Sequence, residues 1–594
     1  MNFIKIIKII KIIKIIKIIK ISDFVLSVKK SSVFFAFVYL FLFFYMENSF
    51  AKHEELRIGV NSEYETLHPI LSSSAVARYM IYFSYRPLVY LDEQSQVRPM
   101  IVKKVPSLTD KSASLVFEKS NEKSPSKNIK KLVATWEFIE GLKWGDGVPI
   151  TCKDLKFAWQ FGLNPNVSLP TKDDVDDIED VIWNEKEPTK CQVKYRVAKW
   201  DFVLRTPSPL PEHLEKEIFQ KFGSEKEGYE HNSLYQKNPA TKGLWNGPYL
   251  VSEAKLGSHI VLVPNENFYG PKPKIKKIII KIITNSGVLE ANLRSKNLDM
   301  ISRIGLDFDQ ALALRSKLEE EKLPYQIVFQ DGVTYYHLDI NLDHPILKEI
   351  KVRKALSFGL NKQEILNSVF EGKATLAHHF TSPLDRLYTE DKKIVTFYEP
   401  DKRKAKALLE EAGWVLDPDG YRYKKGQKLS FSLSLDAESK VNETFGSIIQ
   451  AQWKTLGVDL QVKSEVARFL FTEVIPKRKF DLAMFAWISF PENSQKAVMS
   501  SKNIPSEKNT WTGQNFTGYI NSQADKFADG YEYELDPQKR KHINDELIKL
   551  YTRDIPVLPL YFRSENAVIP KNMKNFKLTG HLYFESLKAE EWEW

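Results

Sequence analysis

The chain has 594 residues, 43% hydrophobic and 27% charged, with a formal net charge of +10. This length exceeds what one hydrophobic core sustains, so two or more lobes are expected. Residues 1–51 carry eight lysines against Asp23 and Glu47. Removing their net +6 leaves about +4 for the remainder, which excludes a nucleic-acid-binding role.

The first 51 residues are typical of an export signal. A Lys-Ile-Ile repeat at 5–20 is either an extended leader, a misassigned upstream start or a membrane-active basic helix. It is followed by Lys29 and Lys30, an apolar run at 33–45 and a Ser-Phe-Ala cleavage motif at 49–51. We expect cleavage after Ala51; without cleavage, the segment would act as a tilted anchor. No cysteine lies near this motif, so we do not expect a lipoprotein.

The first half of the mature chain mixes strands with short helices. Strands are predicted at 56–60, 87–91, 134–138, 192–197, 250–254, 258–264 and 275–283, and helices at 76–85 and 289–296. Thr151 or Asp154 could cap a further helix. Residues 107–131 form a polar insertion, with a short strand at 115–117. Cys152 and Cys191 could pair or remain separate thiols, because sequence does not show their distance.

The second half alternates helices and strands more regularly, which predicts an α/β lobe with a largely parallel sheet. A strand is predicted at 335–342, Asn361 with Glu364 and then Asp401 are helix-capping residues after it, and a further strand follows at 458–462. The run 482–488 predicts a strand buried on both faces. Ligands bind beyond the carboxyl ends of such strands, which indicates a site at 487–493. Two prolines confine the strand at 555–561 to an edge or a crossover.

Seven motifs in order resemble those of the family 5 extracellular solute-binding proteins, the oligopeptide- and dipeptide-binding components of bacterial ABC importers. They include WGDGVPITCKD at 144–154, NGPY at 246–249, with Asn246 where the family has Thr, and the helix motifs at 352–372, 401–414 and 450–458. The resemblance covers nearly all of the mature chain. It implies an α/β, type II periplasmic-binding-protein fold, a two-lobed Venus flytrap with an extra α/β subdomain.

The resemblance also implies the domain organisation. Lobe I would comprise 52–90, 210–325 and 550–594, with the extra subdomain at 91–209, and lobe II would comprise 326–549. Crossings near 326–332 and 545–552 would act as hinges, and Asp331-Gly332 supplies a flexible dipeptide.

In peptide-binding members of the family, the loop that corresponds to the one after the 482–488 strand reads W-x-x-D. The Asp of this motif pairs with the α-ammonium group of the ligand. Here Trp487 matches, but Phe490 stands at the Asp position and cannot neutralise a buried cation. Glu492 could take over from two residues away. The candidate cleft residues are Trp487, Ser489, Phe490, Glu492 and Asn493.

The function implied is that of a periplasmic protein which captures a peptide or similar small solute and delivers it to an ABC permease and ATPase complex in the inner membrane. The alternatives are a receptor or chaperone without a transporter, and a binder of a metal chelate, sugar or opine-like solute. No catalytic motif is present, so we expect no enzyme. His378-His379 is more typical of a structural pair than of a metal site, and we expect a monomer without cofactors.

Overall fold

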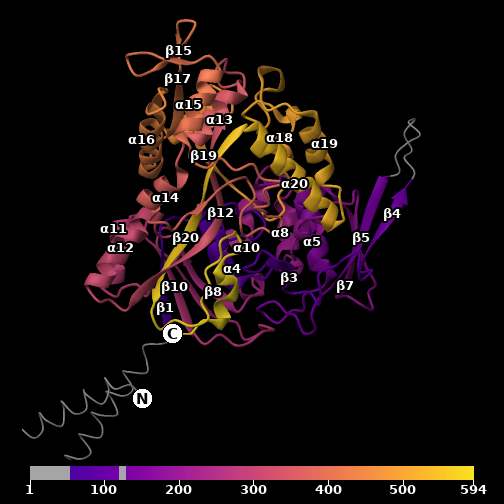
Figure 1. Cartoon of the computed structure of the whole chain (residues 1–594). Helices are drawn as coiled ribbons and strands as arrows, with labels where there is room; N and C mark the ends of the chain where they lie inside the picture. The colour runs from indigo at the N-terminus through magenta and orange to yellow at the C-terminus, as the bar shows by residue number, and fades with distance from the viewer. Residues whose placement is uncertain (1–53, 119–128, 594) are drawn as a thin grey trace, which may run out of the picture. The chain divides into compact units, whose positions relative to one another are not determined.

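The computed structural model describes residues 54–118 and 129–593, and an 11-stranded sheet forms its centre (Figure 1). The predicted leader, signal segment and cleavage site at 1–51 lie outside the described residues. The strand order is β18-β17-β19-β12-β20-β11-β1-β10-β9-β8, and β13 (Thr375–Leu376) pairs with β20 beside this path. The outer strands on one side are β1 (Glu55–Val60), β8 (Tyr249–Lys255), β9 (His259–Pro264), β10 (Lys277–Ile282) and β11 (Met300–Ile301).

Two long strands, β12 (Tyr325–Ile340) and β20 (Val557–Pro570), run antiparallel through the middle of this sheet. The prediction that the 555–561 strand lies at an edge is wrong, since β20 has β12 on one side and β11 and β13 on the other. Pro559 is tolerated there because the register of the two strands shifts between Tyr336 and His337, opposite the proline. Its role as a crossover strand is retained.

The predicted strand at 482–488 is confirmed as β19 (Leu482–Ile488), but its burial on both faces holds only over 482–485, and Ile488 is 57% exposed. It pairs parallel with β17 (Ser430–Asp436), which also pairs parallel with β18 (Asp459–Glu465), but antiparallel with β12. The sheet around β19 is therefore mixed rather than largely parallel. Three small strands, β14 (Val415–Leu416), β15 (Arg422–Lys424) and β16 (Gln427–Lys428), form a separate sheet, and β2 (Val89–Leu91) pairs with β3 (Val97–Pro99).

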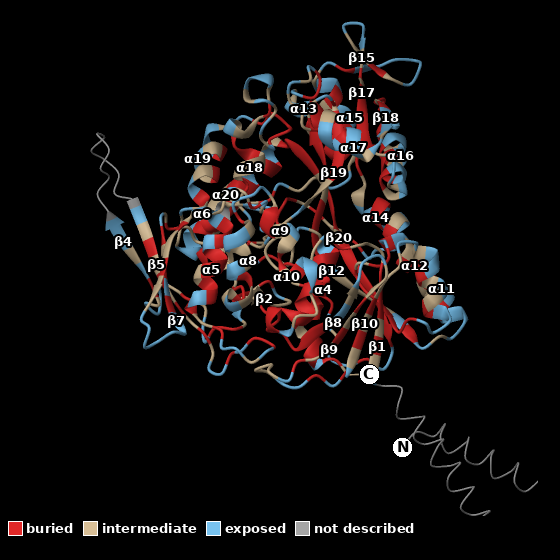
Figure 2. Cartoon of the chain, turned by 180° about the vertical axis from the view of Figure 1, so that it is seen from behind, coloured by how far each residue is buried: buried red, intermediate tan, exposed pale blue. Residues whose placement is uncertain are grey.

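Helices cover this sheet and turn their apolar faces toward it, which leaves exposed outer faces on α11, α12 and α16 (Figure 2). The helices before β12 are α4 (Ala75–Ser84), α5 (Cys152–Leu163), α6 (Asp173–Asp176), α7 (Phe202–Arg205), α8 (Glu212–Phe222), α9 (Gly228–Asn232), α10 (Leu234–Lys237), α11 (Ser286–Arg294) and α12 (Phe308–Glu320). Those after β12 are α13 (Ile350–Phe358), α14 (Lys362–Phe370), α15 (Lys402–Glu411), α16 (Lys440–Lys454), α17 (Ala467–Phe469), α18 (Lys496–Met499), α19 (Ser522–Tyr531) and α20 (Pro537–Asp554).

Two large groups of buried side chains fill the space between these layers. One gathers residues from 56 to 300 together with residues 567–592, and the other gathers residues between 308 and 561. Along the described parts of the chain, no helix is both long and apolar enough to cross a membrane.

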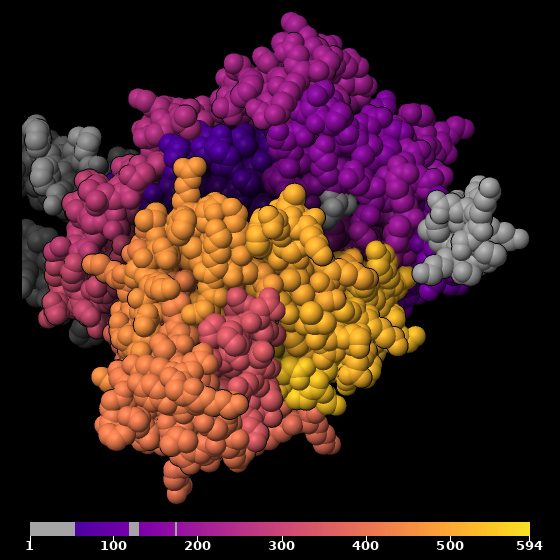
Figure 3. Space-filling view, turned by 90° about the horizontal axis from the view of Figure 1, so that it is seen from above, coloured from indigo at the N-terminus to yellow at the C-terminus, as the bar shows by residue number. Residues whose placement is uncertain are grey.

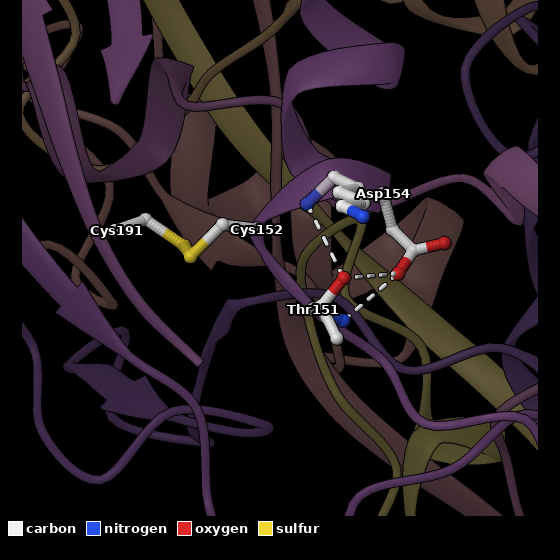
Figure 4. The surroundings of a disulfide bond; sticks show 5 residues. Thr151, Cys152, Asp154 and Cys191 are labelled. Atoms are coloured by element: carbon white, nitrogen blue, oxygen red, sulfur yellow. Dashed lines mark hydrogen bonds between the residues drawn. A yellow bond between two sulfur atoms is a disulfide. The ribbon is translucent and has the colours of Figure 1, made fainter. Parts of the chain in front are cut away.

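Helix α5 packs against a separate four-stranded antiparallel sheet. The strand order of this sheet is β4 (Ala113–Glu118), β5 (Ile129–Glu137), β7 (Lys190–Tyr195) and β6 (Ile178–Trp183). The predicted strand at 115–117 lies within β4. A disulfide joins Cys152, the first residue of α5, to Cys191 in β7, with their Cα atoms 5.5 Å apart (Figure 4). The bond fixes the start of the helix against the sheet.

The WGDGVPITCKD motif at 144–154 builds the turn that precedes α5. The backbone N–H of Thr151 donates to Asp154 Oδ2 at 2.8 Å, and the Thr151 hydroxyl accepts from Lys153 N–H, which caps the helix (Figure 4). Trp144 Nε1–H donates to Asp154 Oδ1 at 3.3 Å. Burial raises the pKa of Asp154 to about 6, against the opposing effect of these hydrogen bonds. The motif is thus a buried structural turn.

The NGPY turn at 246–249 is also structural. Asn246 Oδ1 accepts the N–H of Arg86 at 2.7 Å, and its Nδ2–H donates to the Arg86 carbonyl at 3.1 Å. A Cβ atom on Gly247 would lie 2.5 Å from the Ser84 carbonyl carbon, so this close approach requires glycine. Asn246, which replaces the Thr of the family motif, thereby ties the turn to the end of α4.

Candidate functional site

A cleft of about 990 Å³ lies between residues that precede β12, together with residues 582–583, and residues between β19 and α20. Figure 3 shows the seam, with indigo and purple residues on one side and orange residues on the other. One wall comes from α4, from α7 with the segment before it, and from residues 582–583. The other wall comes from the loop after β19, from α18 and from residues 503–514. The lining includes Arg78, Tyr82, Trp200, Asp201, Leu204, Arg205, Phe490, Glu492, Asn493, Ser494, Lys496, Gln514, Glu532 and Tyr583.

An adjoining pocket of about 240 Å³ shares Asn493, Ser494, Ala497 and Gln514 with the cleft. Trp487 and Ser489 line this pocket rather than the cleft itself. The Trp487 ring stacks on Phe516 with centroids 6.0 Å apart and planes at 14°. The strand that positions it is fixed by pairing with β12, in which Trp487 stands opposite Tyr335.

Phe490 lies on the cleft wall, and 40% of its surface is exposed. Asn493 borders both spaces and is exposed, and its N–H donates to the Phe490 carbonyl at 3.1 Å. Of the five residues predicted at the site, three therefore line the cleft and three line the adjoining pocket, with Asn493 common to both.

Glu492 borders the cleft, but its carboxylate is engaged by the protein. The side chain is 7% exposed, and its oxygens accept from Arg386 Nε and, at 3.0 Å, from Arg540 Nε. Its backbone has a φ of +54°, and its N–H donates to Asp385 Oδ2 at 2.6 Å. Burial raises the pKa of Asp385 to about 6. With both oxygens paired to guanidinium groups, Glu492 is not a free counterion for a ligand amine, which removes the basis for its taking over from Phe490.

Arg540 also connects the two walls. Its guanidinium carbon lies 4.6 Å from the centroid of the Trp200 indole ring, a cation–π contact. The Trp200 N–H donates to the Glu532 carbonyl at 3.3 Å, and its ring meets Tyr531 edge to face. The loop at Glu492 is therefore linked, through one arginine, to the opposite wall.

Three further residues of interest were missed by sequence reasoning. His337 and Asp339 lie under the adjoining pocket, 1% and 4% exposed, with Nε2 and Oδ1 3.3 Å apart. Their alternation in a predicted strand puts both on one face, a signal that was available. Arg78 is the one charged residue of α4, AVARYMIYFS, and a lone charge in such an apolar helix is equally visible in the sequence.

His378 is partly exposed, whereas His379 is buried, so the two side chains do not form the partly exposed pair that adjacent positions suggest. His379 is fully buried with Nε2 2.8 Å from the Thr389 carbonyl, and burial lowers its pKa to about 4. His378 packs against Phe397. Over 54–118 and 129–593, no three His, Cys, Asp or Glu residues gather as metal ligands would.

Residues 122–505 match the model of the bacterial extracellular solute-binding proteins, family 5. The chain belongs to this family. Among its relatives is the oligopeptide-binding protein AppA of Bacillus subtilis, 24% identical over 458 residues, which cover 76% of this chain and 79% of AppA. The nickel-binding periplasmic protein of Escherichia coli is 27% identical over 287 residues, 47% of this chain and 50% of that protein.

Solved structures place this family 5 chain in the same fold. An oligopeptide-binding protein from Thermus thermophilus, complexed with a pentapeptide, has a TM-score of 0.64 and 22% identity over 91% of this chain and 96% of its own. The substrate-binding protein CtaP of Listeria monocytogenes has a TM-score of 0.71 and 20% identity over 91% of this chain and 99% of its own. The fold is therefore the two-lobed α/β fold of family 5 binding proteins.

Proposed function

We propose that this family 5 protein is exported to the periplasm, captures a peptide in its cleft and delivers the peptide unaltered to an ABC importer. The observation that carries the proposal is the cleft of about 990 Å³, whose lining comes from segments before β12 and segments after β19. Support comes from relatives named as oligopeptide-binding proteins. Export by cleavage after Ala51 and release without a lipid anchor are part of this proposal.

The mechanism rests on two lobes that close around the ligand. Lobe I would comprise 52–90, 210–325 and 550–594, and lobe II 326–549. A ligand that touches both walls only in the closed form stabilises that form in proportion to its extra contacts. The permease would recognise the closed surface, so an empty open protein delivers nothing.

Hinges are proposed where the central strands depart from regular pairing. The register of β12 and β20 shifts between Gln330 and Thr334, around the Asp331-Gly332 dipeptide. The second hinge is proposed at 545–552, in the C-terminal part of helix α20 that leads into β20. Bending is easier at an irregular ladder because fewer hydrogen bonds must distort.

Two measurements test the proposal together. Native mass spectrometry of protein purified from the periplasm should detect a retained small solute, and added peptides should be recovered with unchanged mass. Small-angle scattering should then show a smaller radius of gyration with peptide than without. A protein that retains no solute, keeps the same radius, or returns cleaved peptide contradicts the proposal.

A further inference from the structure

Within 54–118 and 129–593, the cleft lining holds one cation, Arg78, that no described side chain neutralises. Arg78 lies in the middle of α4 and is partly buried where the cleft meets a neighbouring pocket of about 230 Å³. Among the described residues, no hydrogen bond or ion pair involves its guanidinium group. A partly desolvated guanidinium has five donors that water satisfies only in part, so an incoming anion gains by binding it.

The other charged groups of the lining are matched within the protein. Asp201 pairs with Arg205 at 2.6 Å, and Glu532 lies 3.6 Å from Lys496. Glu492 is held by Arg386 and Arg540, neither of which lines the cleft. Since Asp201, Glu492 and Glu532, the acidic groups that the structure describes in the lining, each have a basic partner, Arg78 adds a positive charge that none of them balances.

The surroundings of Arg78 fit the body of a solute rather than a bare ion. Tyr82, one helical turn further along α4, also lines the cleft, and its ring lies parallel to that of Tyr583 at 7° with centroids 6.0 Å apart. Across the cleft, Phe490 exposes its ring. One wall therefore offers a cation beside aromatic rings, and the other offers no free carboxylate.

We propose that Arg78 binds a carboxylate of the ligand, so that the cleft selects its peptide by the acidic end and not by the amino end. This inference rests on the proposed function, and it specifies which chemical group of the ligand the site recognises. A guanidinium can hold a carboxylate through two parallel N–H···O bonds, which adds orientation to charge. The carboxylate can be the C-terminus of a peptide or an Asp or Glu side chain, and the test separates these sources.

The probe is a pool of tri- to pentapeptides without Asp or Glu, made in four forms: free, N-acetylated, C-amidated and blocked at both ends. Binding to the full protein is measured by native mass spectrometry and calorimetry. In the wild type, amidation should weaken binding about tenfold or more, the loss expected for one charge-assisted hydrogen-bonded pair. Acetylation should change affinity less than about threefold, because no free carboxylate meets the amine.

Variants assign the effect to Arg78. Arg78→Gln should bind free and amidated peptides alike, and Arg78→Lys should keep part of the preference. Arg468→Gln, at an exposed position outside the cleft, is the matched control and should behave as the wild type. Phe490→Asp should make acetylation harmful by creating an amine site. An amidated pool with one Glu per peptide should regain affinity if a side chain serves as the source.

The outcomes separate this inference from the function on which it rests. If acetylation weakens binding and amidation does not, the reading of the acidic end is overturned while peptide capture stands. If Arg78→Gln keeps the full amidation penalty in a folded protein, the assignment to Arg78 is overturned. If none of the four forms binds, peptide capture fails and this inference fails with it.

Discussion

Two short turns show how differently family resemblance can bear on a structure. The turn at 144–154 matches its family motif, is buried, and satisfies its polar groups internally through Thr151 and Asp154. The loop at 487–493 departs from its motif at Phe490 and faces open space. The motif residues that match at 144–154 maintain the fold, whereas the departure at Phe490 lies on the wall of the cleft. Substitutions in the first should change stability, and substitutions in the second should change binding.

Glu492 tests this division between stability and binding most strongly, because it belongs to the loop but its side chain is buried and paired within the protein. Glu492→Ala should lower the free energy of unfolding by about 3 kcal/mol or more, since it leaves the buried Arg540 without its carboxylate. Chemical denaturation measures the loss. Glu532→Ala, in the looser pair with Lys496, should cost less than about 1 kcal/mol. Equal losses in the two variants would show that burial of the Glu492 pair contributes nothing special.

The disulfide provides a further test that the 144–154 region affects stability and not binding. Replacing Cys152 and Cys191 with serine should lower stability by about 2 to 4 kcal/mol, because a cross-link between residues 39 apart restricts the unfolded chain. Peptide affinity should stay the same. Wild-type protein unfolded in the presence of reductant is the control and should show a similar loss. An affinity change would mean that the 144–154 region does affect the cleft.

Asp154 predicts a pH dependence of stability. Its pKa rises from 3.8 to about 6 on folding, so the folded state binds the proton more tightly than the unfolded state. The contribution is present below about pH 4 and is lost as pH rises through about 6, by up to roughly 3 kcal/mol. Asp154→Asn should flatten unfolding free energy against pH over this window. Asp385 and Glu585, whose pKa values are also raised, should preserve a weaker slope of the same sign.

Replacement of Trp487 should give the smallest effect of the four main substitutions, and the quantity that we expect to change is the affinity for peptide. Trp487→Ala should weaken binding of the best peptide of the pool by about 1 to 3 kcal/mol, through lost burial and stacking in the adjoining pocket. Phe471→Ala, an exposed aromatic outside both spaces, is the calorimetric control. If Trp487→Ala leaves the dissociation constant unaltered, peptide does not reach this pocket.

Local signals were enough to predict much of the fold. Asn361 and Asp401 accept hydrogen bonds from the N–H groups of Glu364 and Lys404, as their positions before two helices predict. The strand at 482–488 was recognisable because its apolar run is bounded by turn signals. These features depend on neighbours within a few residues, which the sequence displays directly.

What sequence could not predict depends on partners far along the chain. Glu492 is a plausible amine site until Arg386 and Arg540, 106 and 48 residues away, are found beside it. The prolines of β20 suggest an edge until the register shift opposite Pro559 is seen. The unmatched charge of Arg78 becomes apparent only when the ion pairs of the residues around it are known.

The pairing of distant segments also has a consequence for how the protein is made. Arg86 is buried against Glu590, 504 positions later, at 2.6 Å, and Trp592 packs on Phe83 of α4. The segments synthesised first thus complete their interior only after the last of these partners has emerged. Such long loops close slowly. For the export that we propose, this delay keeps the first part of the chain unfolded while the rest is synthesised. An unfolded chain is the form that can pass through a narrow channel.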